Sequence, residues 1–143
     1  MSATGSASER GFTLIETLVV VALAALVAGI AFPQIERAIE RQQFRTNEAA
    51  FVQGLRSARA AAIRSSTTTR FALLAGGEQF AVDDKPQPPL TSGLRIAAID
   101  RPMLRFFADG SSDGGRFMLI DRHLRANITV YPSTGVVSLG AAQ

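Results

Sequence analysis

An uninterrupted apolar run near the N-terminus constrains this chain of 143 residues more than any other feature. Residues 12–32 read FTLIETLVVVALAALVAGIAF, and Glu16 is the only charged side chain among them. As a helix the run is about 30 Å long, which equals the thickness of the hydrocarbon core of a bilayer. A carboxylate at depth in a bilayer costs about 2–3 kcal/mol, so we expect Glu16 to have a function.

Two general interpretations of the run stay open on the residues alone. A secretory signal peptide needs a basic start and a small-residue cleavage site. Residues 28–31 (AGIA) could serve as the site, but residues 1–11 offer only Arg10 beside the terminal amine, and Glu9 offsets one of these charges. A plain transmembrane anchor explains the length of the run but leaves Glu16 without a role.

The residues at the start of the run suggest a third interpretation. Residues 11–16 read GFTLIE, which resembles the processing site of type IV prepilins and type II secretion pseudopilins. In that family a membrane peptidase cuts after the glycine, and the new N-terminal residue is N-methylated. The resemblance implies a leader peptide at 1–11, cleavage between Gly11 and Phe12, and methylation of Phe12. Gly11 has no side chain, so the backbone can enter a tight protease cleft in an extended form.

Glu16 lies one helical turn beyond Phe12, on the same face. The resemblance implies that its carboxylate meets the N-terminal amine of a neighbouring subunit in a filament and so sets the axial register. The alternative is a glutamate that only stabilises the N-terminus of its own helix, where a negative charge gains about 0.3–1 kcal/mol.

Charge counting and the resemblance disagree about orientation. Arg37, Arg41 and Arg45 follow the run closely, and the positive-inside rule alone would place them in the cytoplasm. The cut in this family occurs at the cytoplasmic face. The resemblance therefore implies a single-pass protein of the bacterial inner membrane with its C-terminal part in the periplasm.

We expect one helix from about residue 12 to about 65. Its first part, 12–33, is the transmembrane and filament-core segment, with a kink or a melted stretch near Gly29 and Pro33, because proline removes a hydrogen bond from the preceding turn. Its second part, 34–65, is amphipathic and belongs to a head. The apolar stripe comprises Phe44, Phe51, Leu55, Ala58 and Ala62, flanked by Val52 and Ile63.

The helical pattern ends at Ser65–Thr69, and residues 66–143 read as a β head. Short strand-like runs are separated by clusters of turn residues, which favours antiparallel hairpins. The predicted fold is α+β, a long N-terminal helix packed against an antiparallel sheet. The predicted strands are Arg70–Leu74, Gln79–Val82, Leu94–Ile99, Leu104–Phe107, Phe117–Ile120, Ile128–Tyr131 and Val136–Leu139.

Within the pilin-like class the chain resembles the GspH/FimT group of minor pseudopilins and minor pilins. The likeness lies in residues 55–64 (LRSARAAAIR), 106–115 (FFADGSSDGG) and the closing hairpin at 128–137. It implies a minor pseudopilin that joins the periplasmic pseudopilus of a type II secretion system. Its partners would be other major and minor pseudopilins, the prepilin peptidase and the inner membrane. The alternative is a minor pilin of a type IV pilus that acts in pilus initiation or DNA uptake.

The composition argues against other classes of protein. The chain has no cysteine and one histidine, His123, which excludes thiolate and multi-histidine metal sites. Asp109, Ser111 and Asp113 suggest a calcium loop, but the twelfth position of such a loop is Ile120 rather than glutamate. We therefore expect no metal, no cofactor and no catalytic residues, and place His123 in a surface turn. The net charge of +3 is too small to indicate nucleic acid as a partner.

Overall fold

The computed structural model describes residues 13–90 and 93–140. They fall into two compact units that meet between Ile39 and Glu40. Here the described part of the first unit, residues 13–39, is called the stem, and that of the second, residues 40–140, the head. A single helix, α1 (Leu14–Ser65), supplies all of the helical stem and enters the head, so the predicted helix is confirmed.

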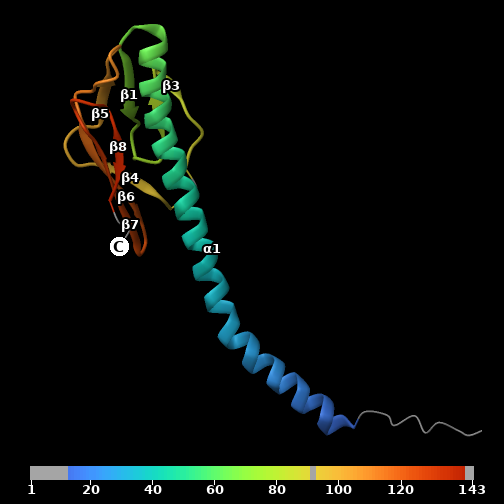
Figure 1. The fold of residues 1–143 in the computed structure, drawn as a ribbon. Coiled ribbons are helices and arrows are strands. Elements are labelled where there is room, and N and C mark those ends of the chain that lie inside the picture. Colours follow the sequence, from blue (N-terminus) through green and yellow to red (C-terminus); the bar gives the residue numbers. More distant parts are fainter. Residues whose placement is uncertain (1–12, 91–92, 141–143) are drawn as a thin grey trace, which may run out of the picture. The chain divides into compact units, whose positions relative to one another are not determined.

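The head part of α1 is buried along one side, because apolar residues recur there at helical spacing. The predicted stripe of Phe44, Phe51, Leu55, Ala58 and Ala62 is buried, and so is Val52. Ile63 is different, since 45% of its surface is exposed. In Figure 1 the green part of α1 runs alongside the strands of the head.

The strands form two antiparallel sheets of four strands each. The first has the order β3-β2-β1-β5, and the second has the order β4-β6-β7-β8. The bounds are β1 (Thr69–Leu73), β2 (Phe80–Val82), β3 (Lys85–Pro86), β4 (Arg95–Ala98), β5 (Met103–Phe106), β6 (Gly115–Asp121), β7 (Leu124–Val130) and β8 (Val137–Leu139). The α+β class is confirmed, with two sheets where the sequence predicts one.

The division into two sheets arises where the chain leaves β4. This strand pairs with β6, whereas the next strand, β5, pairs with β1. A hydrogen bond of 2.7 Å runs from the Ile96 amide in β4 to the carbonyl of Gly77, which lies in the turn between β1 and β2. Short connections usually place consecutive strands side by side, but β4 and β5 lie in different sheets.

Two hairpins differ from the predicted pattern. Asp83 and Asp84 have φ angles of 48° and 61°, as the two-residue turns of tight hairpins require, so β3 begins within the predicted loop. The second difference concerns β7, which begins at Leu124 rather than Ile128. The turn before it is only Arg122-His123, and His123 is exposed there as predicted.

Phe51 joins the three layers of the head. Its ring packs edge-on against Phe71 and Phe80 of the first sheet, with centroids 5.5 and 5.4 Å away, and against Phe117 of the second sheet at 5.4 Å. Edge-to-face pairs add about 0.5–1.5 kcal/mol to the free energy gained by burying the rings. The core of the head is therefore centred on α1, at the point where both sheets contact it.

Candidate assembly site

The start of α1 is closed by a residue inside the predicted mature chain. The Thr13 carbonyl accepts hydrogen bonds from the amides of Glu16 and Thr17 at 3.1 and 3.2 Å. The Thr13 hydroxyl also accepts a bond from the Glu16 amide at 3.3 Å. Thr13 is thus the N-cap, and Glu16 occupies the position at which capping boxes carry glutamate.

The carboxylate of Glu16 takes no part in this cap. The bond to Thr13 comes from the main-chain amide of Glu16, and its side chain is exposed. Among residues 13–90 and 93–140, no hydrogen bond or ion pair engages that carboxylate. Both functions considered for Glu16 therefore stay open, and the oxygen atoms remain available to a second group. Gly11 and Phe12 lie outside the described residues.

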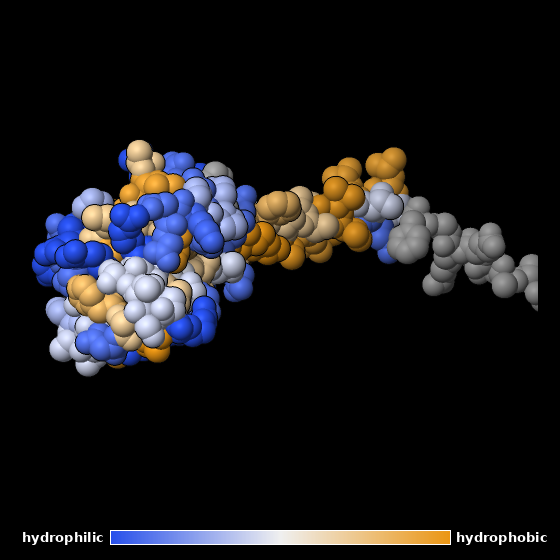
Figure 2. Space-filling model, turned by 90° about the horizontal axis from the view of Figure 1, so that it is seen from above, coloured by the Kyte–Doolittle hydropathy of each residue, from blue (hydrophilic) through white to orange (hydrophobic). Residues whose placement is uncertain are grey.

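The stem presents apolar side chains on every side. Thirteen large hydrophobic residues between Leu14 and Ile39 are more than half exposed, from Val19 at 51% to Leu14 at 80%. In Figure 2 the stem shows mainly apolar residues on the face in view. Within the described residues α1 is the one helix long and apolar enough to cross a membrane, and none of its most apolar window is buried. The stem is therefore not the core helix of a soluble domain.

Gly29 and Pro33 both lie within α1, where the described backbone is helical at every residue. The melted stretch considered for residues 29–33 is thus not present. A Cβ atom added at Gly29 would have no neighbour within 4 Å. The predicted kink stays a prediction.

Both carboxylates of the turn at 109–115 are engaged by other residues of the head. Asp109 accepts hydrogen bonds from the amide and hydroxyl of Ser111 at 2.9 and 2.6 Å, and these bonds lower the pKa of Asp109. Asp113 accepts a bond from the amide of Arg105 and lies 3.2 Å from its guanidinium. No group of three potential metal ligands occurs in the described part of the chain.

Asp113 also covers the outer edge of β5. Its side chain accepts the Arg105 amide at 2.7 Å, and its own amide donates to the Arg105 carbonyl at 3.2 Å. Both main-chain groups of Arg105 that face away from β1 are therefore occupied, so another strand cannot pair with β5 at this point.

Arg59 connects α1 to two glycine turns, and no pattern in the sequence predicts this role. Its Nε donates a hydrogen bond of 2.9 Å to the Gly110 carbonyl. Gly110 and Gly135 have φ angles of 83° and 61°, which side chains rarely tolerate. A Cβ atom at Gly135 would lie 2.2 Å from the Gly110 oxygen and 3.0 Å from the Arg59 Nε. The glycines of the DGSS and STG sequences are therefore needed for the end of α1 to pack against these two turns.

Gly135→Ala is expected to lower the free energy of unfolding of the head by about 3 kcal/mol, because the left-handed backbone costs about 1–2 kcal/mol and the contact with Gly110 costs more. Gly76→Ala is the matched control, since Gly76 has a φ of 89° but no atom within 4 Å of the added Cβ. Only the backbone cost applies there. Denaturant unfolding of the full chain in detergent, followed by the fluorescence of Tyr131, compares the two. Equal losses would contradict the role of the Gly110 contact.

Known proteins resemble this chain in both its N-terminal motif and its fold. Residues 6–32 match the family model described as the prokaryotic N-terminal methylation motif. Type II secretion system protein H of Xanthomonas campestris pathovar campestris is 29% identical over 140 residues, which cover 92% of this chain and 83% of that protein.

Two solved structures share the fold. The type IV minor pilin FimU of Pseudomonas aeruginosa superposes with a TM-score of 0.63 and 13% identity, covering 71% of this chain and 91% of that one. The minor pseudopilin EpsH of the type 2 secretion system of Vibrio cholerae gives a TM-score of 0.55 with 15% identity, covering 69% and 97%.

The N-terminal methylation motif and the fold shared with FimU and EpsH confirm the resemblance to type IV pilin-like proteins that is seen in GFTLIE. Within that class the chain is similar to protein H of type II secretion systems over nearly its whole length. The pilins and pseudopilins that it resembles are structural proteins. An exposed apolar N-terminal helix of this kind is consistent with anchoring in the inner membrane.

Proposed function

We propose that this chain is a minor pseudopilin of a type II secretion system, which assembles through its N-terminal helix into the periplasmic pseudopilus. The observation that carries the proposal is a stem whose apolar side chains are exposed, joined to a head that has a core of its own. An exposed apolar surface of this kind must be covered, by lipid before assembly and by the stems of other subunits afterwards. The proposed work is mechanical, with no catalytic residue and no cofactor.

Maturation comes first in the proposed sequence of events. A prepilin peptidase removes residues 1–11 by cutting between Gly11 and Phe12, and Phe12 is methylated. The stem then anchors the chain in the inner membrane with residues 12–33 as the span, and the head lies in the periplasm. The match of residues 6–32 to the methylation motif supports this order.

The Glu16 carboxylate, which has no partner among the described residues, supplies the specificity of assembly. When the stem moves from lipid into a filament core, apolar burial gains little free energy, because both surroundings are apolar. Close packing and polar pairs must then determine which arrangement is favoured. A carboxylate without a partner inside an apolar core is costly, and the N-terminal amine of a neighbouring subunit removes that cost only in one axial register.

Glu16→Ala is expected to be processed normally yet to enter filaments at least about tenfold less, because losing one member of a buried pair costs about 3–5 kcal/mol. The measurement is the amount of the variant in sheared pseudopilus fractions relative to the membrane pool. Glu36→Ala is the matched control, since Glu36 is an exposed carboxylate of the same helix. Normal incorporation of Glu16→Ala would remove the pairing role and favour a glutamate that only stabilises the N-terminus of its own helix.

A minor pilin of a type IV pilus, acting in pilus initiation or DNA uptake, is the alternative. FimU supports it through the fold alone, at 13% identity. The likeness to protein H covers 92% of the chain at 29% identity, so the type II secretion reading has better support. The uncharged residues 136–140 also leave the final strand without a basic cluster for nucleic acid.

A further inference from the structure

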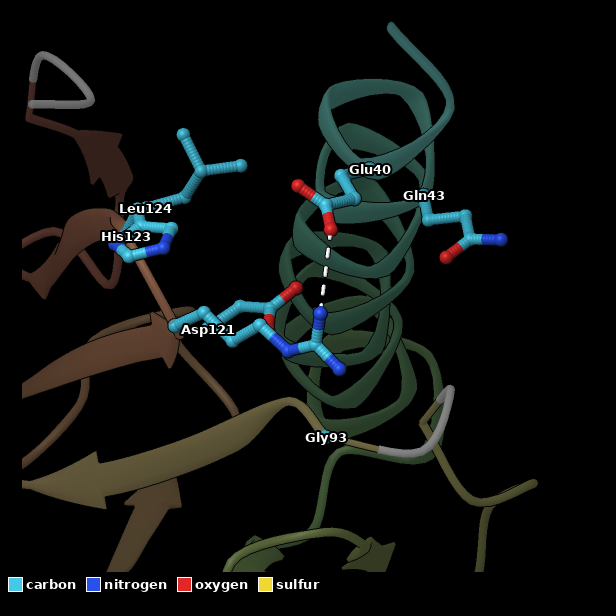
Figure 3. Close-up of a pocket in the computed structure, with 7 residues that line it drawn as sticks. Glu40, Gln43, Gly93, Asp121, His123 and Leu124 are labelled. Carbon is cyan, nitrogen blue, oxygen red and sulfur yellow. Dashed lines mark hydrogen bonds and ion pairs between the residues drawn. The ribbon is translucent and has the colours of Figure 1, made fainter. Parts of the chain in front are cut away.

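The turn between β6 and β7 is bound to the first residue of the head. The guanidinium of Arg122 lies 3.3 Å from the Glu40 carboxylate, and this contact is the dashed line in Figure 3. Glu40 and Gln43 of α1 line a depression together with Asp121, His123 and Leu124. The end of the head at which α1 enters is therefore also the end at which the β6–β7 turn lies.

This end of the head carries an excess of arginine. Arg41 and Arg45 follow Glu40 on α1, and Arg125 follows the β6–β7 turn, and all three are exposed. No carboxylate pairs with any of them in the part of the chain that the structure describes. We call Glu40, Arg41, Arg45, Asp121, Arg122 and Arg125 the basal surface. Its four arginines and two carboxylates give a net charge of +2, and the next carboxylate on α1 is Glu48.

The basal surface is close in the chain to the segment proposed to span the membrane. Glu40 is seven residues beyond Pro33, and seven residues cover about 10 Å as a helix and at most about 25 Å when extended. Whatever angle the head adopts, its first residue therefore stays within reach of the headgroup layer. The bond from Glu40 to Arg122 brings the β6–β7 turn within the same reach.

We propose that the basal surface binds the phosphate groups of anionic lipids at the periplasmic face of the inner membrane while the subunit awaits assembly. This inference rests on the proposed membrane anchoring. Guanidinium groups form paired hydrogen bonds with phosphate oxygens. Each arginine at an anionic membrane surface favours contact by about fivefold. In the proposed orientation Arg41 and Arg45 lie on the periplasmic side, where the positive-inside rule disfavours basic residues. Contact with anionic lipid would give these charges a partner.

The test uses the full chain in a membrane. Because the chain has no cysteine, one introduced cysteine gives a single site for a fluorescent label. A fluorophore on His123→Cys reports on the β6–β7 turn. The same fluorophore on Ser133→Cys reports on the turn at the opposite end of β7 and serves as the control position. Each protein is reconstituted into vesicles of phosphatidylcholine, alone or mixed with phosphatidylglycerol, that contain a headgroup-labelled quencher lipid.

Phosphatidylglycerol is expected to increase quenching at position 123 several-fold and to leave position 133 unchanged. Raising the salt concentration should reverse the increase, because the charges are exposed. Arg41→Gln with Arg125→Gln should abolish it, whereas Arg122 is kept so that its bond to Glu40 persists. Arg56→Gln with Arg64→Gln is the matched control, because it removes two exposed arginines farther along α1 that form no ion pair within the described part of the chain.

Four other outcomes would contradict the proposal, each in a different way. If the chain is extracted from the vesicles by carbonate, the proposed anchoring fails, and with it the basis of the inference. If the chain is anchored but quenching is equal in both lipids, or unchanged by the Arg41 and Arg125 substitutions, lipid binding by the basal surface is wrong. If inorganic phosphate reverses the effect at an ionic strength where sodium chloride does not, the surface is a site for free phosphate instead. If adding unlabelled subunits lowers the quenching at position 123 equally in both lipids, the surface contacts protein rather than lipid.

Discussion

Gly11→Ala is expected to leave the full-length chain in the membrane with its first 11 residues attached. A methyl group at this position must fit where the backbone enters the peptidase, and a displacement of the scissile bond by about 1 Å can cost about 100-fold in rate. Methylation of Phe12 should be lost as well, because its amine is never freed. Intact-mass spectrometry of the membrane fraction distinguishes the precursor from the processed chain.

Gly5→Ala makes the same chemical change six residues upstream in the leader and is the control. It should be processed like the wild type, because Gly5 lies outside the GFTLIE sequence. A mature product from Gly11→Ala that begins at a methylated Phe12 would contradict the assigned cleavage site. A wild-type product that begins after residue 31 would instead favour the signal-peptide interpretation.

Phe51→Ala is expected to reduce the free energy of unfolding of the head by about 3–5 kcal/mol, because removing a buried ring leaves a cavity. Phe51 has no exposed surface and loses three ring contacts, with Phe71, Phe80 and Phe117. Native domains unfold with a free energy of about 5–15 kcal/mol, so this loss is about a fifth of the total or more. Tyr131 is the only tyrosine and the chain has no tryptophan, so fluorescence during denaturant unfolding reports on the head.

Phe107→Ala is the matched control for this second prediction. Phe107 lies next to the end of β5, only partly buried, and its ring lies 5.9 Å from the guanidinium carbon of Arg105. A cation–π contact at such a position contributes about 0.5–1 kcal/mol, so the expected loss is much smaller. Similar losses for the two variants would mean that Phe51 does not join the layers of the head.

The helix and its buried side could be predicted because each depends on local spacing. Apolar residues three or four apart identify the face of α1 at Phe51, Leu55 and Ala58, whatever the rest of the chain does. The strand pairing could not be predicted in the same way. Nothing local to residues 99–102 shows that β4 pairs with β6 while β5 crosses to β1, because this choice depends on contacts distant in the sequence.

The first four residues of β7 could not be predicted for a different physical reason. Residues 124–127 alternate between Leu124 and Ala126 on the inner side and Arg125 and Asn127 on the outer side. A small buried alanine between two polar residues gives a weak apolar signal, so the sequence suggests a longer turn. The ring of Phe80 is a related case. It lies where a Cβ atom at Gly54 would be, at 2.4 Å, and spacing along α1 does not indicate such a close approach.

The proposed site was predictable to the extent that it follows one continuous motif. GFTLIE identifies Gly11, Phe12 and Glu16 together, and these assignments remain predictions. The contacts of Arg59 with Gly110 and of Arg122 with Glu40 join residues 51 and 82 positions apart. No pattern in the sequence indicates those partners, because a surface arginine and a docking arginine look the same until the chain is folded.

The position of the helix cap has a consequence for maturation. Thr13 closes the first turn of α1 through its hydroxyl and carbonyl, and it lies beyond the proposed cut. Removing residues 1–11 therefore takes away none of the groups that terminate the helix. The proposed leader carries one acidic and one basic residue, Glu9 and Arg10, so its removal would shorten the subunit without changing its net charge. The capped first turn of α1 would then need no refolding step before the processed subunit is recruited.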